Sequence, residues 1–470
     1  MKTIIIGIDG LEFEVIQRQI KELPNFKIIL DKGILCKVDS VFPADSVPAW
    51  LTIFTGLNPA GHGIIRGKDY VESVEDYEKL HTFKLEAKSF WDYLSSRKKK
   101  CLVLNPFLAY PAWSINGLMI SGPAFVKGNI SIKPESHQTK NTNVYGGYSA
   151  VSSFVNLKQE MKNAVTDTKI LWTEFITQYS KEEYDLAFVT FTTLDRIQHY
   201  SWRFYDETDE MHEIDSYLSS LIPNTIKLFD SFLGEVIETM KKDDNLVLIS
   251  DHGFCKRPFN LINLNELLRQ ADLLKTNNEA SKVSTFYKQK LKNIIVRFLS
   301  KTHLLDKVMS NVKKIPGISK YKKSDYLIDK ENSICYVDEL FSGKKPYVGL
   351  NFGSKLKNET LERRRHYYNL ISNILNNHKD MPKLKWICLN IDLYKGDFEN
   401  NLPDICIELP KEYGVEFELF GNLITTSSTH YKLSGGHYGS STFGHYSPGG
   451  KFKKINSILD FHDFIISLYS

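Results

Sequence analysis

The stretch that decides the fold is TIIIGIDG, which runs from Thr3 to Gly10. Its apolar run is interrupted only by Gly7 and stops at Asp9. A run of this length with no polar alternation is typical of a strand buried on both faces of a sheet. Open α/β sheets bind their ligands at the carboxyl ends of such strands. We therefore expect Asp9 to lie at the ligand-binding edge of a sheet.

Further apolar runs alternate with helical patterns along the chain. The runs predicted as strands are Gly33–Val41, Lys100–Leu104, Gly117–Ser121, Tyr184–Phe191 and Asn245–Ser250. The segments predicted as helices are Glu12–Leu23, Phe90–Ser96, Leu157–Tyr179 and Ile214–Met240. Strands that alternate with helices predict the α/β class, with a mostly parallel central sheet and helices on both of its faces.

The length of 470 residues suits one large α/β domain with an insertion, or two domains. The predicted parts are an α/β core over 1–270, a basic helical insertion or cap over 271–345, a small α+β subdomain over 346–430, and a return to the core over 431–470. Within the last part, Ser434–Gly450 is rich in Gly, Ser, Tyr and His. We predict that it forms a loop before a final helix at Ile455–Leu468.

The composition is that of an ordinary globular protein, with 42% hydrophobic and 25% charged residues. The six cysteines are scattered and form no CxxC pair, which argues against a disulfide framework or a thiolate metal site and suits a reducing compartment. The N-terminal apolar run is too short for a signal peptide, and no window reaches the roughly 18 apolar residues of a spanning helix. These features predict a cytoplasmic protein.

The basic charge is concentrated in one segment. Between Lys275 and Lys323 there are thirteen lysines and arginines and only two acidic residues, although the net charge of the chain is +4. Within this segment, Lys282–Met309 has apolar residues at helical spacing. One interpretation is a solvated basic helix packed on the body. Another is a cap that attracts an anionic substrate, or a surface that contacts lipid or nucleic acid. The sequence gives no firm signal for either macromolecule, and segment 275–323 leaves both open.

Three acidic groups each follow a predicted strand: Asp9, then Asp195 with His199, then Asp251 with His252. Each is weak evidence alone, because an Asp after a strand is often a helix cap and DHG can be a plain turn. At one edge of one sheet, however, three carboxylates would repel one another strongly. Two divalent metal ions would balance that charge, and nitrogen with oxygen ligands fits zinc or manganese. The late loop would add a further ligand, for which His437 and His445 compete.

A serine lies in the stretch VFPADSVPAWLTIFTGLNPAGHGI, from Val41 to Ile64. Ser46 stands two residues before Pro48, so the backbone there is extended and a helix can begin at Pro48 or Ala49. The simple interpretation is that Ser46 caps this helix. The alternative is that its hydroxyl, at the positive end of the helix and beside metal ions, is a nucleophile for phosphoryl transfer.

The motifs together carry a family resemblance. The stretch around Ser46, the strand end GIDG, LDRIQH, ISDHGF and SGGH resemble the alkaline phosphatase superfamily, and within it the type I phosphodiesterase/nucleotide pyrophosphatase family. The resemblance implies an alkaline-phosphatase-like fold and two divalent metal ions. It makes Ser46 the nucleophile, which also touches the first metal. The implied ligands are Asp9, Asp251 and His252 for the first metal and Asp195, His199 and His437 for the second. SGGH matches the family motif, so His437 is preferred to His445.

Other histidines receive minor roles under this resemblance. His62 would cap the turn after the nucleophile helix, whereas His430 and His445 would lie near the mouth of the site or on the surface. After His62 the family often has a phosphate-binding Asn, but here Gly67 stands at about that place, and Arg66 or Lys68 would have to supply the donor.

The sulfatase signature is absent, because Trp50 stands where that signature has Arg. The predicted function is a metal-dependent phosphoric ester hydrolase, of the phosphodiesterase or nucleotide pyrophosphatase type, acting on a small phosphate ester such as a nucleotide or nucleotide sugar. The alternatives are a phosphomonoesterase or phosphomutase of the same superfamily, and a non-catalytic protein that binds an anionic ligand.

Overall fold

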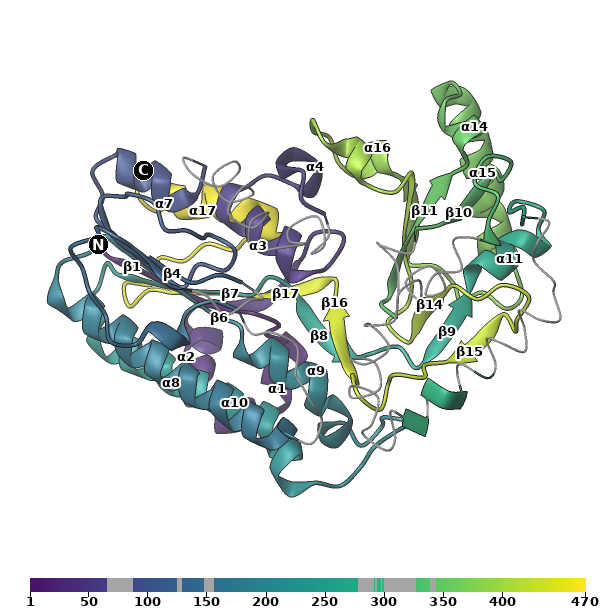
Figure 1. The fold of residues 1–470 in the computed structure, drawn as a ribbon. Helices are drawn as coiled ribbons and strands as arrows, with labels where there is room; N and C mark the ends of the chain where they lie inside the picture. The colour runs from purple at the N-terminus through teal and green to yellow at the C-terminus, as the bar shows by residue number, and fades with distance from the viewer. Residues whose placement is uncertain are drawn as a thin grey trace.

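The computed structural model describes residues 1–65, 88–124, 129–147, 156–277, 327–338 and 344–470, together with residues 291, 294–296, 298 and 299. Predictions that concern Arg66, Gly67 and Lys68, and nearly all of segment 275–323, fall outside the described residues. Figure 1 shows two parts, a large sheet with helices on both faces and a smaller group of strands and helices beside it.

The large sheet of the described residues has eight strands in the order β2-β17-β7-β1-β6-β3-β4-β5. Its centre is parallel, because β1 (Thr3–Ile8) pairs in parallel with β6 (Leu186–Phe191) and β7 (Asn245–Ile249). The parallel part continues through β3 (Cys101–Leu104) to β4 (Gly117–Ser121). The remaining strands are antiparallel to their neighbours: β2 (Ile34–Asp39), β5 (Ser131–Lys133) and β17 (Ser440–Tyr446). The predicted α/β class with a mostly parallel sheet is confirmed.

Helices cover both faces of this sheet (Figure 1). One face is covered by α1 (Phe13–Arg18), α2 (Pro24–Lys32), α8 (Leu157–Lys181), α9 (Thr193–Tyr205) and α10 (Ser216–Thr239). The other is covered by α3 (Ser46–Thr55), α7 (Phe90–Ser96) and α17 (Phe461–Ser467). Successive side chains of β1 alternate between these two cores, with Ile4 and Ile6 in the first and Ile5 in the second. Burial on both faces is the physical reason for the unbroken apolar run.

The smaller part is built on antiparallel strands. Its four-stranded sheet has the order β10-β11-β13-β12 and consists of Cys335–Val337, Tyr347–Phe352, Ile405–Glu408 and Trp386–Leu389. A three-stranded sheet joins β9 (Asn260–Asn263) to β14 (Tyr413–Glu416) and β15 (Ile424–Thr426). The helices that accompany them are α11 (Leu264–Gln270), α14 (Ser354–Lys357), α15 (Leu361–Asn377) and α16 (Asn390–Leu393). This part has a hydrophobic core of its own, separate from the two cores of the large sheet.

The loop predicted over Ser434–Gly450 is wrong. It contains β16 (Gly435–Tyr438), which pairs with β8 (Gly253–Lys256), and β17, which lies inside the large sheet between β2 and β7. The β17 sequence SSTFGHY has one large apolar residue, Phe443, so it lacks the apolar run of a buried strand. Several of its polar groups are buried with partners: Ser441 donates to the Ser250 carbonyl, Thr442 donates to the Leu11 carbonyl, and His445 donates from Nε2 to Asn245 Oδ1 at 3.1 Å.

Smaller differences concern helix ends. The helix predicted over Glu12–Leu23 is divided into α1 and a short 3-10 helix, Ile20–Glu22. The final helix is likewise a 3-10 turn, Ile458–Asp460, followed by α17. Of the helices that the structure describes, none has the length and apolarity that crossing a membrane requires.

Candidate metal centre and active site

The acidic groups predicted from three strand ends meet at one edge of the large sheet. Asp9 follows β1 and Asp251 follows β7, and these strands are direct neighbours. Asp195 comes from the first turn of α9, which begins directly after β6 on the other side of β1. His437 is supplied by β16, whose partner β8 begins beside His252. The topology of the sheet therefore brings together residues that are far apart in the sequence.

A first group consists of Asp9, Asp251 and His252, which are all buried. One potential ligand atom from each lies within 4.8 Å of the others, so this group could hold a metal ion. The Ser46 hydroxyl donates to Asp9 Oδ1 at 3.3 Å and lies 3.1 Å from His252 Nε2. The serine oxygen is thus in contact with two of the three candidate ligands.

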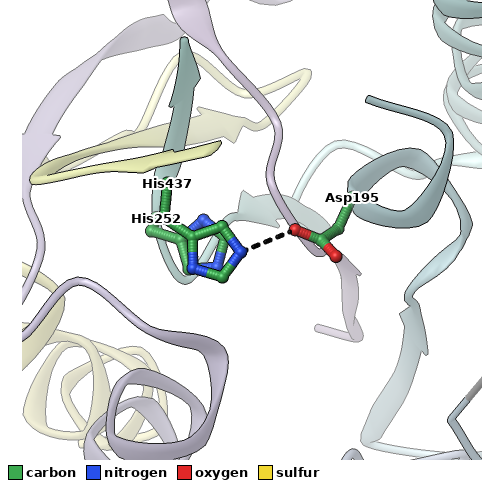
Figure 2. A group of neighbouring side chains, drawn as sticks. All are labelled: Asp195, His252 and His437. Atoms are coloured by element: carbon green, nitrogen blue, oxygen red, sulfur yellow. Dashed lines mark ion pairs between the residues drawn. The ribbon is translucent and has the colours of Figure 1, made fainter. Parts of the chain in front are cut away.

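A second group adds Asp195 and His437 to His252, again within 4.8 Å. Figure 2 shows the imidazole of His437 directed at the Asp195 carboxylate, with a distance of 3.2 Å between Nε2 and Oδ1. His199 belongs to the same place, because its Nε2 is 2.9 Å from His437 Nε2 and 3.4 Å from Asp195 Oδ1. The structure therefore brings together all seven residues predicted for the site, with His252 between the two groups.

The charges of these groups are poorly matched within the protein. Burial, and then the repulsion of Asp251 and Asp195, raise the pKa of Asp9 well above its ordinary value. Burial and the charge of Asp195 do the same to the pKa of Asp251. Burial, followed by the charge of His252, lowers the pKa of His437 to about 3. Burial opposes the ionisation of Asp195, but His199 and His437 lower its pKa below the ordinary value. The two carboxylates that resist ionisation, those of Asp9 and Asp251, are a costly arrangement next to an imidazole that resists protonation when left uncompensated.

Three side-chain atoms of these two groups could serve as metal ligands. Asp195 Oδ1, Asp251 Oδ2 and His437 Nδ1 are buried and have no hydrogen-bond partner among the described residues. The Nε2 atoms of His199 and His437 face each other at 2.9 Å, a hydrogen-bond distance, so both imidazoles direct a nitrogen to the same place. Buried carboxylate oxygens and neutral imidazole nitrogens are the donor set of zinc and manganese sites.

Local backbone geometry explains the close approach of Asp9 and Asp195. Gly10, directly after Asp9, has φ +70°, and a Cβ there would lie 3.2 Å from the Cα of Asp195. Glycine is the residue that accepts both conditions at no steric cost. The Gly10 amide donates to Asp251 Oδ1 at 3.1 Å, and its carbonyl accepts from Gln198 at 2.7 Å. The turn thus ties the end of β1 to β7 and to α9.

Helix α3 begins at Ser46 itself, and Asp45 is its N-cap residue, so the interpretation of Ser46 as a simple cap is wrong. All ten residues of α3 are buried, and the hydroxyl lies at the positive end of the helix. Trp50, one turn further on, donates from Nε1 to Asp9 Oδ2 at 3.0 Å. Its ring packs where Gly7 has no side chain. Trp50 therefore orients the Asp9 carboxylate, a role that its position in the sequence did not indicate.

Sequence reasoning missed a contact from the smaller part. Lys345, two residues before the start of β11, donates from Nζ to Asp45 Oδ2 at 2.5 Å and to the Tyr347 hydroxyl at 2.8 Å. Burial opposes the ionisation of Asp45, but Lys345 lowers its pKa below the ordinary value. Lys345 therefore anchors the residue that precedes Ser46. No local pattern marks this lysine, because the contact joins residues 300 positions apart.

The remaining histidines are structural. His62 is buried and accepts from the Ile64 amide through Nδ1, as expected for a residue that fixes the turn. His430 and His445 were predicted near the mouth or on the surface, which is wrong, because both are fully buried. His430 Nε2 lies 3.0 and 2.9 Å from the two oxygens of Asp209. Burial of these imidazoles depends on long-range partners that local sequence does not reveal.

A cavity of about 390 Å³ opens onto Ser46, Asp9, Asp195, His199 and His437. Its wall also contains four cationic side chains, those of Arg196, Arg257, Lys344 and Lys345. A space of this size suits a small molecule. The arrangement combines a hydroxyl at a helix N-terminus, two groups of candidate metal ligands and a positively charged wall.

Comparison with known proteins identifies the family of the chain. The family described as type I phosphodiesterase/nucleotide pyrophosphatase matches residues 3–407. The chain therefore belongs to this family of phosphoester hydrolases. The comparison with curated proteins found no match.

Solved structures with the same fold include phosphonoacetate hydrolase from Sinorhizobium meliloti 1021 in complex with phosphonoformate. It has 13% sequence identity and a TM-score of 0.52, over 100% of this chain and 96% of that chain. A second solved structure, that of murine ectonucleotide pyrophosphatase/phosphodiesterase 5, matches with 12% identity and a TM-score of 0.45, over 100% of this chain and 95% of that chain. At these identities the likeness concerns the fold alone.

Proposed function

We propose that this protein is a two-metal phosphodiesterase in which Ser46 is the nucleophile. The observation that carries the proposal is the position of the Ser46 hydroxyl, 3.3 Å from Asp9 Oδ1 and 3.1 Å from His252 Nε2, at the first residue of a buried helix. A serine that only capped a helix would contact backbone amides of its own helix. This one contacts two candidate metal ligands instead.

The residues that would hold the metals are divided as the family resemblance implies. Asp9, Asp251 and His252 would hold one divalent ion, and Asp195, His199 and His437 the other, with zinc or manganese as the metal. Bound there, the ions would lower the pKa of the serine hydroxyl and neutralise charge on the phosphoryl oxygens. The unpartnered oxygens of Asp195 and Asp251 support this division, because one lies in each group.

The protein's own residues supply the nucleophile and its position. Ser46 Oγ attacks phosphorus and loses its proton, a bond from Oγ to phosphorus forms, and the bond to the leaving oxygen breaks. The leaving alcohol gains one proton. Water then attacks the same phosphorus, a new P–O bond forms, and the bond from Ser46 Oγ to phosphorus breaks. The water loses one proton, Ser46 Oγ gains one, and a phosphomonoester is released. Trp50 holds Asp9 and Lys345 holds Asp45, so the residues on both sides of the serine are fixed before the reaction.

The test is the turnover of an aryl phosphodiester by Ser46→Ala. We expect the rate to fall on the order of 10³-fold or more, because the nucleophile is removed, while metal content stays near that of the wild type. Ser121→Ala is the matched control, since Ser121 is a buried serine at the end of β4 whose hydroxyl has no partner among the described residues. Wild-type rates in Ser46→Ala would refute the proposal.

A further inference from the structure

The cationic wall of the cavity contains one arginine in an unusual setting. Arg257 directly follows β8, and its amide donates to the Ser434 carbonyl at 2.7 Å. Its side chain crosses the face of Gly436, where a Cβ would lie 3.5 Å from Arg257 Cβ and Cγ. Gly436 precedes the candidate ligand His437. The pairing of β8 with β16 therefore places Arg257 next to the strand that carries His437, and both residues line the cavity.

The other cations of the wall have acidic neighbours. Arg196 pairs with Glu160 at 3.0 Å, and Lys345 pairs with Asp45 at 2.5 Å. Lys344 Nζ lies 3.8 Å from Glu416 and donates to Thr429 Oγ1 at 3.1 Å. Each of these side chains has a role in holding the protein together.

Arg257 differs from them. Its one side-chain hydrogen bond among the described residues runs from Nε to the Lys344 carbonyl at 3.2 Å, and no carboxylate of those residues lies within ion-pair distance of it. Glu416 acts on it only at longer range. Burial lowers the pKa of Arg257 to about 10, so the group still carries its charge at neutral pH. The Nε bond fixes the plane of the guanidinium and leaves its Nη hydrogens for another partner.

An uncompensated guanidinium that is largely removed from water is costly unless it meets an anion. A planar fork of N–H donors fits a carboxylate or a phosphate. The same cavity holds Ser46, so a substrate with its phosphorus at the serine would extend a second group toward Arg257.

We propose that Arg257 binds a second anionic group of the substrate, a carboxylate or a phosphate on the substituent that stays on phosphorus. This inference rests on the proposed phosphodiesterase function and gives its substrate class: a phosphodiester that carries one further negative charge beyond the diester. Lys344, whose carbonyl orients the guanidinium, adds positive charge on the same side. Arg257 is a residue that determines specificity, and the bond cleavage itself belongs to Ser46.

The test uses four 4-nitrophenyl phosphodiesters that differ only in the second alcohol. In the first pair this alcohol is glycolate or its neutral amide, and in the second pair it is 2-phosphoethanol or neutral ethylene glycol. The metal-loaded wild type should cleave the anionic member of at least one pair with a kcat/KM on the order of 10-fold to 100-fold higher, as expected for a charge-assisted bidentate contact. The pair with the larger ratio identifies the anion as carboxylate or phosphate.

Replacement of the arginine separates recognition from folding. Arg257→Met, which keeps the bulk of the side chain, should reduce the ratio to near one, and Arg257→Lys should restore part of it. Lys256→Met is the matched control, because the neighbouring Lys256 pairs with Glu210 and lines a different cavity. It should retain the wild-type ratio.

The outcomes are distinct. A wild-type ratio near one in both pairs, or an unchanged ratio in Arg257→Met, would overturn the role of Arg257. Cleavage of all four probes that survives Ser46→Ala would instead overturn the proposed function. The contact can also be measured without turnover. The dissociation constant of the glycolate diester should be higher, by a similar factor, for metal-loaded Ser46→Ala that also carries Arg257→Met than for metal-loaded Ser46→Ala alone.

Discussion

Two groups of aspartate and histidine side chains are buried in this protein, but their charges and hydrogen-bond partners are arranged differently. The metal-centre group of Asp9, Asp195, Asp251, His199, His252 and His437 contains three carboxylates whose charges oppose one another. The structural pair of Asp209 and His430 contains one carboxylate and one imidazole, with both carboxylate oxygens within 3.0 Å of His430 Nε2. The first leaves buried oxygens unpartnered, and the second uses both of its oxygens.

The two groups differ in a way that distinguishes a candidate active site from a structural contact. Both are buried, and both contain residues able to hold a metal. In the pair, a single carboxylate has His430 and the Met211 amide as hydrogen-bond partners, although His430 Nδ1 has no partner among the described residues. The metal-centre group instead brings three carboxylates together, a repulsion that added positive charge would relieve. The repulsion between its carboxylates, together with the Ser46 hydroxyl at hydrogen-bond distance, distinguishes the metal-centre group as the candidate active site.

Removal of metal should produce the largest effect and should act through the metal-centre group alone. A strong chelator should abolish turnover of an aryl phosphodiester, and zinc or manganese should restore it. Binding to the folded state stabilises it by about 4 kcal/mol when the free ion is a thousandfold above Kd, so the melting temperature should fall on chelation. If neither turnover nor the melting temperature changed on chelation, the metal-centre group would hold no metal, and its proposed difference from the Asp209–His430 pair would be refuted.

Truncation of the structural pair should affect stability and leave chemistry intact. His430→Ala leaves the Asp209 carboxylate buried without its partner, which costs about 3–5 kcal/mol of unfolding free energy. Urea denaturation measures this loss, and elemental analysis should show unchanged metal content. Combining Asp209→Asn with His430→Gln should recover part of the stability, since no charge is then left alone. A loss of bound metal in His430→Ala would contradict the structural assignment.

A third buried histidine, His445, has no carboxylate among its hydrogen-bond partners in the described residues. His445 Nδ1 accepts from the Lys453 amide at 3.0 Å and Nε2 donates to Asn245 Oδ1, which holds the neutral imidazole. Burial lowers its pKa to about 4, whereas the unfolded chain takes up this proton near pH 6.5.

The unfolded state therefore binds more protons below pH 6.5, and the unfolding free energy should fall as pH falls toward about 4. The slope is about 1.4 kcal/mol per pH unit at its steepest. His445→Gln should reduce this slope by close to one proton in denaturation curves recorded between pH 4 and 7. Equal slopes in both proteins would show that His445 is charged in the folded state.

The smallest predicted effect is an increase in stability, which is opposite in sign to the effect expected for the structural pair. Asp251→Asn keeps an oxygen for the Gly10 amide but removes one of the repelling charges. Because the pKa of Asp251 is raised, its ionised form destabilises the metal-free fold at neutral pH. Metal-free Asp251→Asn should therefore be more stable than metal-free wild type by on the order of 1 kcal/mol, although it binds metal poorly. Asp209→Asn should change stability in the opposite direction, and the same sign in both variants would contradict the account.

Much of the fold and of the metal centre could be predicted from local sequence. The runs that end at Asp9 and Asp251 are apolar because both faces of their strands are buried, so they were recognisable without neighbours. The spacing of Asp195 and His199 indicated one helix face, as found in α9. These signals are local in the chain.

What could not be predicted depends on distant partners. Strand β17 reads as a loop because its polar residues are satisfied only by strands far away in the sequence, as His445 is by Asn245. Lys345 contacts Asp45, and Arg257 has no carboxylate within ion-pair distance among the described residues, because distant segments meet where the smaller part adjoins the large sheet. Long-range contacts of this kind leave no periodicity to read.

The central claim is that the metal-centre group holds two metal ions beside Ser46. Elemental analysis of purified protein, with protein concentration from amino-acid analysis, tests it most directly when wild type, Ser46→Ala and Asp195→Asn are measured side by side. The account predicts close to two equivalents of zinc or manganese per chain in wild type, little change in Ser46→Ala, and a loss of about one equivalent in Asp195→Asn. No bound divalent metal in wild type, after expression in metal-replete medium, would contradict it.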